Sequence, residues 1–291
     1  MISVCLIAGL GNRMFCYAFA LGLKEKGYDA YIDEDSFTPR SSMTFEDVKM
    51  EKIFPNIKFK KTPVGAFPYC CVMGRKGIVV RKLLNIINKI YIEERSFNKI
   101  LDVDKVIREN CCFIGQWQSE KYFENAVDEV KRQFTFLPFD EKKNIDIAEK
   151  MSRENSVAIH IRKGKDYSSS FWGGTCSKEY YESAINFLKS KLEKPVFYVF
   201  TDNKDWVEEN LDCLEYTYVD WNPIKGPKNF RDMQLMACAQ NNIIANSSYS
   251  WWGAYLNPNP NKIVIAPNQW FSPNEKKYQH NSIVPETWIK M

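Results

Sequence analysis

His160 and Arg162 are the residues whose types and spacing most directly indicate chemistry. They alternate with Ile159 and Ile161 at the end of the apolar run SVAIHIR, which has the composition of a β-strand, so their side chains share one face. A planar guanidinium at the carboxyl end of a buried strand can bind a diphosphate through two parallel hydrogen bonds. The alternative is structural, with Arg162 in a salt bridge and His160 as a satisfied core histidine.

A second group of polar residues lies in the run NSSYSWWG, residues 246–253, which leads from a predicted strand into a predicted helix. Backbone N–H groups and hydroxyls at a helix N-terminus attract phosphate. The same residues also suit a serine cap followed by two core tryptophans, and the two roles do not exclude one another. The candidates for ligand contact here are Asn246, Ser247, Ser248, Ser250 and Trp251.

Asp202 lies at the polar end of the strand predicted over residues 195–203, just beyond its apolar part. Its carboxylate could accept hydrogen bonds from the N1–H and N2–H groups of guanine, or from a ribose hydroxyl. The alternative is that Asp202 forms an Asx turn or caps the next helix.

The turn Gly9-Leu10-Gly11-Asn12 lies between a predicted strand and a predicted helix. Asp33 stands about where a ribose-binding acid would lie in a dinucleotide enzyme. Dinucleotide enzymes have the glycine pattern G-x-G-x-x-G at this turn. Met14 occupies the position of its third glycine, which argues against a nicotinamide enzyme. The turn could instead present Asn12 to a ligand in a cleft.

Strands alternate with helices in both halves of the chain, a pattern that predicts parallel, doubly wound sheets with ligands at the carboxyl ends of the strands. Leu137-Pro138 and a charged segment at 140–146 mark a boundary. We therefore expect one domain over 1–140, a second over 150–270, and a tail over 271–291 that packs on the first domain. Residues 75–91 predict a basic amphipathic helix, either an ordinary surface helix or one that contacts a membrane or an acceptor.

The composition excludes several classes of protein. A formal charge of +4 is too small for nucleic-acid binding and favours an anionic small substrate. Nine cysteines without a C-x-x-C pair, together with two histidines, argue against structural zinc and favour a reducing, cytoplasmic compartment. No apolar run reaches about 18 residues, and the N-terminus lacks a signal-peptide pattern. We expect at most peripheral membrane association.

Four segments, taken in order, resemble the bacterial α-1,2-fucosyltransferases of glycosyltransferase family 11. GLGNRMFCYAFA resembles the family's opening GLGNQMFQYAFA, and GQWQSEKYF resembles a mid-chain segment of the same enzymes. HIRKGKDY resembles HxRxGDY, which α-1,6-fucosyltransferases and protein O-fucosyltransferases also have, and NNIIANSSYSWWGAYLN resembles the family's most distinctive run. The resemblance extends from residue 4 to about residue 270.

The sequence departs from the family pattern in three places. Lys165 separates Gly164 from Asp166, which puts the role of Asp166 in doubt. Arg13 and Cys16 replace glutamines of the opening segment. In addition, Ala8 replaces a frequent glycine.

The resemblance implies a GT-B-like α/β fold, in which two Rossmann-like domains with parallel sheets face each other across a cleft. It further implies inverting transfer of L-fucose from GDP-fucose to the 2-hydroxyl of a terminal β-galactoside of a glycan, without a metal or other cofactor. The donor would bind to the C-terminal domain and the acceptor to the N-terminal one. The product would be a fucosylated polysaccharide or glycan.

In this scheme Arg162 stabilises the departing diphosphate, while Asn12 and His160 assist catalysis. The donor is bound by Arg162, Lys163, Asp202 and the polar run that begins at Asn246. Further candidates for donor contact are Gly9, Gly11, Asp166, Tyr167 and Asp232. The alternatives are a fucosyltransferase of another linkage, a non-catalytic GDP-sugar or glycan-binding protein, and a dinucleotide-dependent oxidoreductase.

Overall fold

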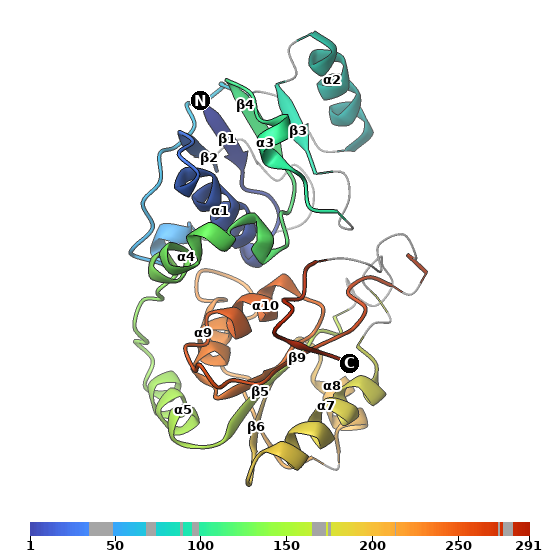
Figure 1. Ribbon diagram of the computed structural model, residues 1–291. Helices are drawn as coiled ribbons and strands as arrows, with labels where there is room; N and C mark the ends of the chain where they lie inside the picture. The colour runs from blue at the N-terminus through green and yellow to red at the C-terminus, as the bar shows by residue number, and fades with distance from the viewer. Residues whose placement is uncertain are drawn as a thin grey trace. The chain divides into compact units, whose positions relative to one another are not determined.

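The structure, a computed structural model, describes residues 1–34, 49–67, 74–87, 90–94, 99–164, 173, 176–212, 214–272, 274–275 and 282–291. The chain divides into two compact units (Figure 1). The first comprises Met1–Thr135 and Asn281–Ile283, and the second comprises Phe136–His280 and Val284–Met291. Asp166 and Tyr167, both predicted to contact the donor, lie outside the described residues, as does Lys165.

The first unit is built on a parallel sheet with the strand order β2-β1-β4-β3 within the described residues. Its strands are short, apolar and almost wholly buried, as expected for a parallel sheet that is covered on both faces. The elements are β1 (Ile2–Cys5), α1 (Leu10–Glu25), β2 (Ala30–Asp33), η1 (Met50–Lys52), α2 (Gly74–Ile87), β3 (Tyr91–Glu93), α3 (Val103–Val106), β4 (Cys111–Ile114), η2 (Glu120–Tyr122), η3 (Glu124–Ala126) and α4 (Val127–Gln133).

Helix α1 is buried on nearly all sides, and two glycines explain how it fits. A Cβ on Gly22 would lie only 2.3 Å from the carbonyl oxygen of Tyr122, so this position needs glycine for the close approach of the η2 backbone. Gly27 follows the helix with φ +87°, a left-handed conformation that glycine adopts without strain. Along the helix, Phe19 stacks on Trp117 with 4.3 Å between the ring centroids.

The second unit is built on a larger parallel sheet, with the order β10-β9-β8-β5-β6-β7 within the described residues. Strands β5, β6 and β8 lie side by side, and α7 packs its buried face against them through Tyr181 and Leu188. The elements are α5 (Lys142–Arg153), β5 (Ser156–Ile161), α7 (Lys178–Lys191), β6 (Val196–Thr201), α8 (Lys204–Asn210), β7 (Tyr216–Tyr218), α9 (Arg231–Cys238), β8 (Asn241–Ile243), α10 (Ser248–Tyr255), β9 (Val264–Ala266) and β10 (Ile289–Lys290).

The predicted α/β architecture with two parallel sheets is confirmed. Strand β10, at the end of the predicted tail, pairs with β9 in the second sheet, whereas the Ser282 carbonyl accepts a hydrogen bond from Ser119 Oγ of the first unit (2.8 Å). The tail is thus divided between the two units. Among the described residues, no helix is long and apolar enough to cross a membrane.

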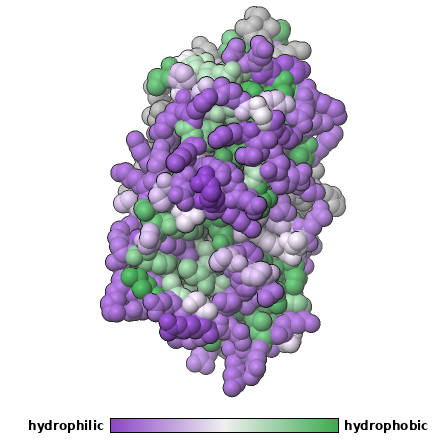
Figure 2. Space-filling view, turned by 60° about the vertical axis from the view of Figure 1, so that its left-hand side comes forward, coloured by the Kyte–Doolittle hydropathy of each residue, from purple (hydrophilic) through white to green (hydrophobic). Residues whose placement is uncertain are grey.

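The surface drawn in Figure 2 is mostly hydrophilic, with smaller hydrophobic areas between the polar side chains. Half of the large exposed apolar side chains in the described part of the chain belong to a single helix, α2: Ile78, Val79, Leu83 and Ile86.

Candidate active site

The carboxyl ends of β5, β6 and β8 form the edge of the second sheet at which the predicted residues gather. The strands are neighbours and parallel, so their ends meet at one edge. The register pairs Ile161 of β5 with Thr201 of β6. Arg162 and Asp202, the residues that directly follow these two strands, therefore lie side by side. Ser247, which follows β8, lies beyond the same edge.

Asp202 fixes the turn after β5. Its Oδ1 accepts from the backbone N–H of Lys163 (2.8 Å), and its Oδ2 accepts from that of Gly164 (3.0 Å). Oδ2 also forms an ion pair with Arg162 Nη1 at 2.6 Å. Both carboxylate oxygens are thus engaged by the turn that carries the guanidinium, and the cap of α8 is Asn203 rather than Asp202, because Asn203 Oδ1 accepts from Trp206 N.

His160 is neutral at physiological pH. Burial, with a smaller contribution from the positive charge of Arg162, lowers the pKa of its imidazole to about 3. The ring lies beside that of Tyr249, with 5.9 Å between centroids. Its Nδ1 is buried and has no hydrogen bond to the described residues. His160 therefore adds no charge to the edge, and its position allows Nδ1 to make one further hydrogen bond.

The turn into α10 is held by its own buried polar groups. Ser247 caps the helix by accepting from Tyr249 N, and buried Ser250 donates to the carbonyls of Ala245 and Ser247. Asn246 is also buried and donates to the Trp270 carbonyl at 2.8 Å.

Trp251 is fully buried and stacks on Tyr255. Asn246, Ser250 and Trp251 therefore shape the turn from within. Among the residues of the run predicted to contact the donor, Ser247 and Ser248 are half-buried rather than buried.

Asp232, in the first turn of α9, lies near the same edge. Burial raises the pKa of its carboxyl to about 6 and outweighs the hydrogen bond from Asn222, which lowers it. The negative charge of Asp232 also contributes to raising the pKa of Tyr249, whose hydroxyl donates to the Asn229 carbonyl and accepts from Met233 N. Asp232 and His160 thus both lie near Tyr249.

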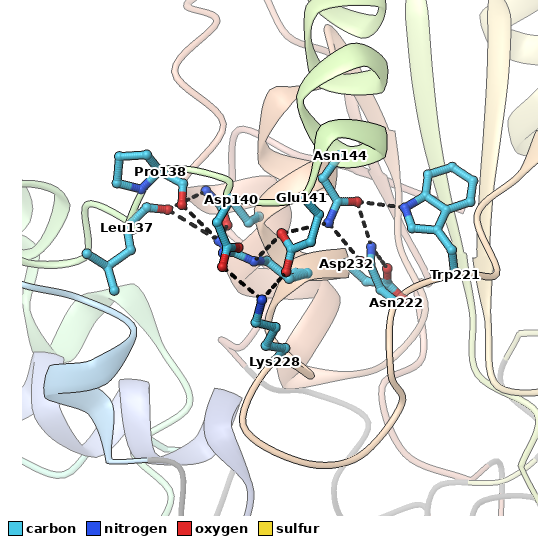
Figure 3. Close-up of polar contacts among 11 residues, drawn as sticks. Leu137, Pro138, Asp140, Glu141, Asn144, Trp221, Asn222, Lys228 and Asp232 are labelled. Carbon is cyan, nitrogen blue, oxygen red and sulfur yellow. Dashed lines mark hydrogen bonds and ion pairs between the residues drawn. The ribbon is translucent and has the colours of Figure 1, made fainter.

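A chain of amide hydrogen bonds orients the Asp232 carboxylate (Figure 3). The Trp221 indole N–H can only donate, and it donates to Asn144 Oδ1 at 2.7 Å. That interaction fixes the amide of buried Asn144, whose Nδ2 donates to Asn222 Oδ1 at 2.8 Å. The amide of Asn222 is fixed in turn, and its Nδ2 donates to Asp232 Oδ1 at 2.8 Å. Oδ2 of Asp232 has no hydrogen bond in the described part of the chain.

Charged groups anchor the other end of this network (Figure 3). Asn144 Nδ2 also donates to Glu141 Oε2 at 3.3 Å. Lys228 Nζ bridges Asp140 and Glu141 at 2.8 and 2.7 Å. The buried guanidinium of Arg231 pairs with both carboxylates. Because Arg231 and Asp232 are adjacent, these contacts tie the start of α9 to the segment that precedes α5.

In the first unit, Asn12 lies in the first turn of α1. Its Oδ1 accepts from Gln118 Nε2 at 2.6 Å, and the Gly9 carbonyl accepts from Asn12 N at 3.0 Å. Gly9 is the N-cap of the helix, and Gly11 lies buried in its first turn. The predicted contact of these residues with the donor stays a prediction.

Ala8 has φ +60°, a left-handed conformation that strains any residue with a Cβ. This strain is a physical reason for the glycine that is frequent at the corresponding place in the family resembled.

Two further features of the described residues lie outside this edge of the sheet or concern metal binding. A hollow of about 630 Å³, lined by residues such as Lys24, Tyr28 and Phe59, lies at the amino end of β2, away from the carboxyl ends of the strands. No group of three or more His, Cys, Asp or Glu side chains in the described ranges is placed to hold a metal ion. Metal independence of the reaction stays a prediction.

Comparison with known proteins identifies the family. Residues 108–291 match the model of glycosyl transferase family 11. The chain belongs to this family. It is similar to an alpha-1,2-colitosyltransferase of Escherichia coli, with 31% identity over 98% of this chain and 97% of that protein. It is also similar to the O-antigen biosynthesis glycosyltransferase WbnK of Escherichia coli, with 28% identity over 99% of both chains.

The fold of this family 11 chain is similar to that of a mutant of Arabidopsis thaliana FUT1 solved in complex with GDP. The TM-score is 0.53 at 10% identity, over 94% of this chain and 72% of that one. The predicted GT-B-like fold is thereby confirmed.

Sequence reasoning missed Asn144, Trp221 and Asn222. Trp221 and Asn222 lie in a loop between β7 and α9, and Asn144 lies in α5. No spacing in the sequence links them, because their contact depends on how α5, the loop and α9 pack.

Proposed function

We propose that this family 11 enzyme transfers L-fucose from GDP-fucose to the 2-hydroxyl of a terminal β-galactoside, with inversion at the anomeric carbon and without a metal ion. The observation that carries the proposal is the guanidinium of Arg162, which Asp202 holds at the carboxyl edge of a parallel sheet. The similarity to an α-1,2-colitosyltransferase supports the linkage, and the similarity in fold to a protein solved in complex with GDP supports the nucleotide.

The reaction is a single displacement. The acceptor oxygen forms a bond to C1 of the sugar while the bond from C1 to the β-phosphate oxygen breaks, and the bonding electron pair leaves with GDP. The proton of the acceptor hydroxyl passes to solvent as the new bond is completed. Negative charge grows on the diphosphate in the transition state, where fixed donors and cations are most effective. Arg162 supplies the positive charge that stabilises the diphosphate. Ser247, Ser248 and the N-terminus of α10 supply hydrogen-bond donors from the neighbouring strand end.

His160 has a supporting role in this scheme. A neutral imidazole cannot neutralise a phosphate, but Nδ1 can make a hydrogen bond to one of its oxygens. That bond would satisfy the buried nitrogen.

Asp232 is a better candidate than Asp202 for binding the guanine base. Asp202 already accepts from two backbone N–H groups and Arg162, whereas Asp232 holds one oxygen on Asn222. A carboxylate can accept from N1–H and N2–H of guanine, and adenine lacks this pair of donors. We therefore assign base recognition to Asp232 and the positioning of Arg162 to Asp202.

A second candidate donor is GDP-colitose, because a similar protein along nearly the whole chain carries the name of a colitosyltransferase. Colitose is the 3-deoxy form of L-fucose, so the same diphosphate chemistry serves either sugar. The two donors differ only in the presence of the sugar 3-hydroxyl. The protein groups that surround this position therefore decide which donor is preferred.

One assay tests the proposal. Purified protein is incubated with GDP-fucose and lactose in the presence of EDTA, with GDP-colitose and GDP-mannose as competing donors. We expect GDP release, and an α-1,2-linked product in the NMR spectrum. Because L-fucose is β-linked in the donor, an α-linked product demonstrates inversion. Hydrolysis without transfer, a β-linked product, or complete loss of activity with EDTA would contradict the corresponding part of the proposal.

A further inference from the structure

Helix α2 of the first unit leaves a row of large apolar side chains in contact with water. Val79, Leu83 and Ile86 are 54%, 59% and 76% exposed. Their spacing of four and three residues places them on one face of the helix. Ile78 is also exposed and lies next to this row. We call these four side chains the α2 apolar row.

The opposite face of α2 is anchored to the sheet, so the apolar row is not an unfolded or frayed end. Arg81 is buried and forms an ion pair with Glu93 of β3, with 2.5 Å between Nε and Oε1. The Asn85 amide donates to the Tyr91 carbonyl and accepts from Tyr91 N. Because β3 is the edge strand within the described part of this sheet, α2 lies at the border of the unit, as Figure 1 shows. Its outward face is thus fixed.

The charges of α2 are all of one sign. The helix contains Arg75, Lys76, Arg81 and Lys82 and no acidic residue. Exposed Lys76 is three residues before Val79, and exposed Lys82 is four residues after Ile78 and four before Ile86. Lys82 therefore lies between Ile78 and Ile86, and Lys76 lies beside the row, so basic and apolar side chains share this face. A fixed helix with apolar residues on its outer face and lysines beside them matches an anionic lipid surface, in which acyl chains lie beneath negative headgroups.

We propose that α2 is an interfacial helix that binds the protein to an anionic phospholipid bilayer. Val79, Leu83 and Ile86 enter the boundary between headgroups and acyl chains, while Lys76 and Lys82 contact lipid phosphates. The helix lies parallel to the membrane plane and does not span the bilayer. This binding is independent of the proposed sugar transfer, since none of the residues involved belongs to the candidate active site.

Vesicle sedimentation tests the proposal on the full chain. We expect the protein to sediment with vesicles that contain phosphatidylglycerol and to remain in the supernatant with phosphatidylcholine alone. Binding should weaken as salt rises, because lysine–phosphate attraction is screened. The triple variant Val79→Ser, Leu83→Ser, Ile86→Ser should lower the partition coefficient at least about tenfold.

The matched control is the double variant Val64→Ser, Ile224→Ser, which removes apolar side chains that are 90% and 63% exposed elsewhere. It should bind vesicles like the wild type. The pair Lys76→Glu, Lys82→Glu should lose binding to phosphatidylglycerol, whereas Lys52→Glu, Lys194→Glu changes the net charge equally at exposed positions outside α2 and should retain most of it. Circular dichroism confirms that each variant is folded.

Three results would overturn the proposal. The first is no sedimentation of the wild type with phosphatidylglycerol. The second is equal sedimentation of the wild type and the α2 triple variant. The third is a wild-type dimer in light scattering that the triple variant makes monomeric, without vesicle binding, because a second copy of the chain would then cover the apolar row.

Discussion

Replacing Asp202 by asparagine distinguishes two roles for its carboxylate, positioning Arg162 and binding guanine. The substitution keeps the size and shape of the side chain. However, an asparagine amide has one acceptor oxygen and one donor nitrogen. Whichever way the amide is turned, its nitrogen meets a donor: the backbone N–H of Lys163 on one side, or that of Gly164 together with the guanidinium of Arg162 on the other.

The structure gives the size of the expected effect. At least one backbone N–H loses its acceptor, which costs about 1–3 kcal/mol where the group stays shielded from water. Loss of the half-buried Arg162 ion pair adds a smaller amount. We expect Asp202→Asn to lower the free energy of unfolding by about 1–4 kcal/mol. A misplaced Arg162 should lower kcat by roughly tenfold to 10³-fold, the upper value being typical for loss of a transition-state donor.

Base selectivity decides between the two roles. Inosine diphosphate lacks the N2 amino group of guanine, so the ratio of its inhibition constant to that of GDP measures recognition of that group. If Asp202 only positions Arg162, the ratio should stay at the wild-type value in Asp202→Asn while kcat falls. Asp205→Asn, at an exposed site in α8, is the control. A ratio that collapses towards one in Asp202→Asn, with nearly normal kcat, would refute the positioning role.

The remaining predictions concern charge geometry, protonation and backbone strain. Arg162→Lys keeps the charge but loses the planar fork, so kcat should fall about 10²-fold in steady-state assays, whereas Arg153→Lys, at an exposed site, should have no effect. Affinity for GDP, measured by calorimetry, should fall as pH drops below about 6, because protonated Asp232 has lost its negative charge and cannot accept from both N1–H and N2–H of guanine. Asn222→Leu should move the midpoint of this fall in affinity to higher pH, because the Asn222 hydrogen bond lowers the pKa of Asp232. Asp232→Asn should abolish the pH dependence. Ala8→Gly should raise the free energy of unfolding by about 1 kcal/mol in urea titrations, because glycine adopts the left-handed φ of residue 8 without strain; an unchanged urea midpoint would contradict this.

The longer elements could be predicted from sequence because their apolar patterns are local. The runs that became β5, β6 and α1 have the composition or spacing of buried strands and a buried helix, and Gly27 marked the end of α1. Short strands such as β7 and β10 have no such pattern, since their pairing depends on neighbours far along the chain. The charged segment at 140–146 continues into α5, and the side chains of Asp140 and Glu141, just before that helix, pair with Lys228 and Arg231.

Arg162 could be predicted for a different reason from Asp202. The position of Arg162 at a strand end follows from the run in which it lies. The function of Asp202 depends on β6 being the neighbour of β5, in a register that brings its carboxylate to Lys163 N and Gly164 N. Sequence alone does not contain that register. It therefore left an Asx turn or a helix cap as the alternative to guanosine binding by Asp202, and the cap proved to be Asn203.

The neutral amide of Asn222 beside Asp232 affects how the site could select a nucleotide base. A lysine or arginine in place of Asn222 would neutralise the carboxylate and lower its pKa strongly. An amide holds one oxygen in place by a neutral hydrogen bond and leaves the charge available to donors on a ligand. Burial makes that charge costly in the free protein, which is why the pKa rises to about 6. A ligand that brings two N–H groups to the carboxylate offsets the free energy of burying its charge. A ligand without those groups does not, so it binds more weakly. Burial of the Asp232 charge is therefore a source of base selectivity.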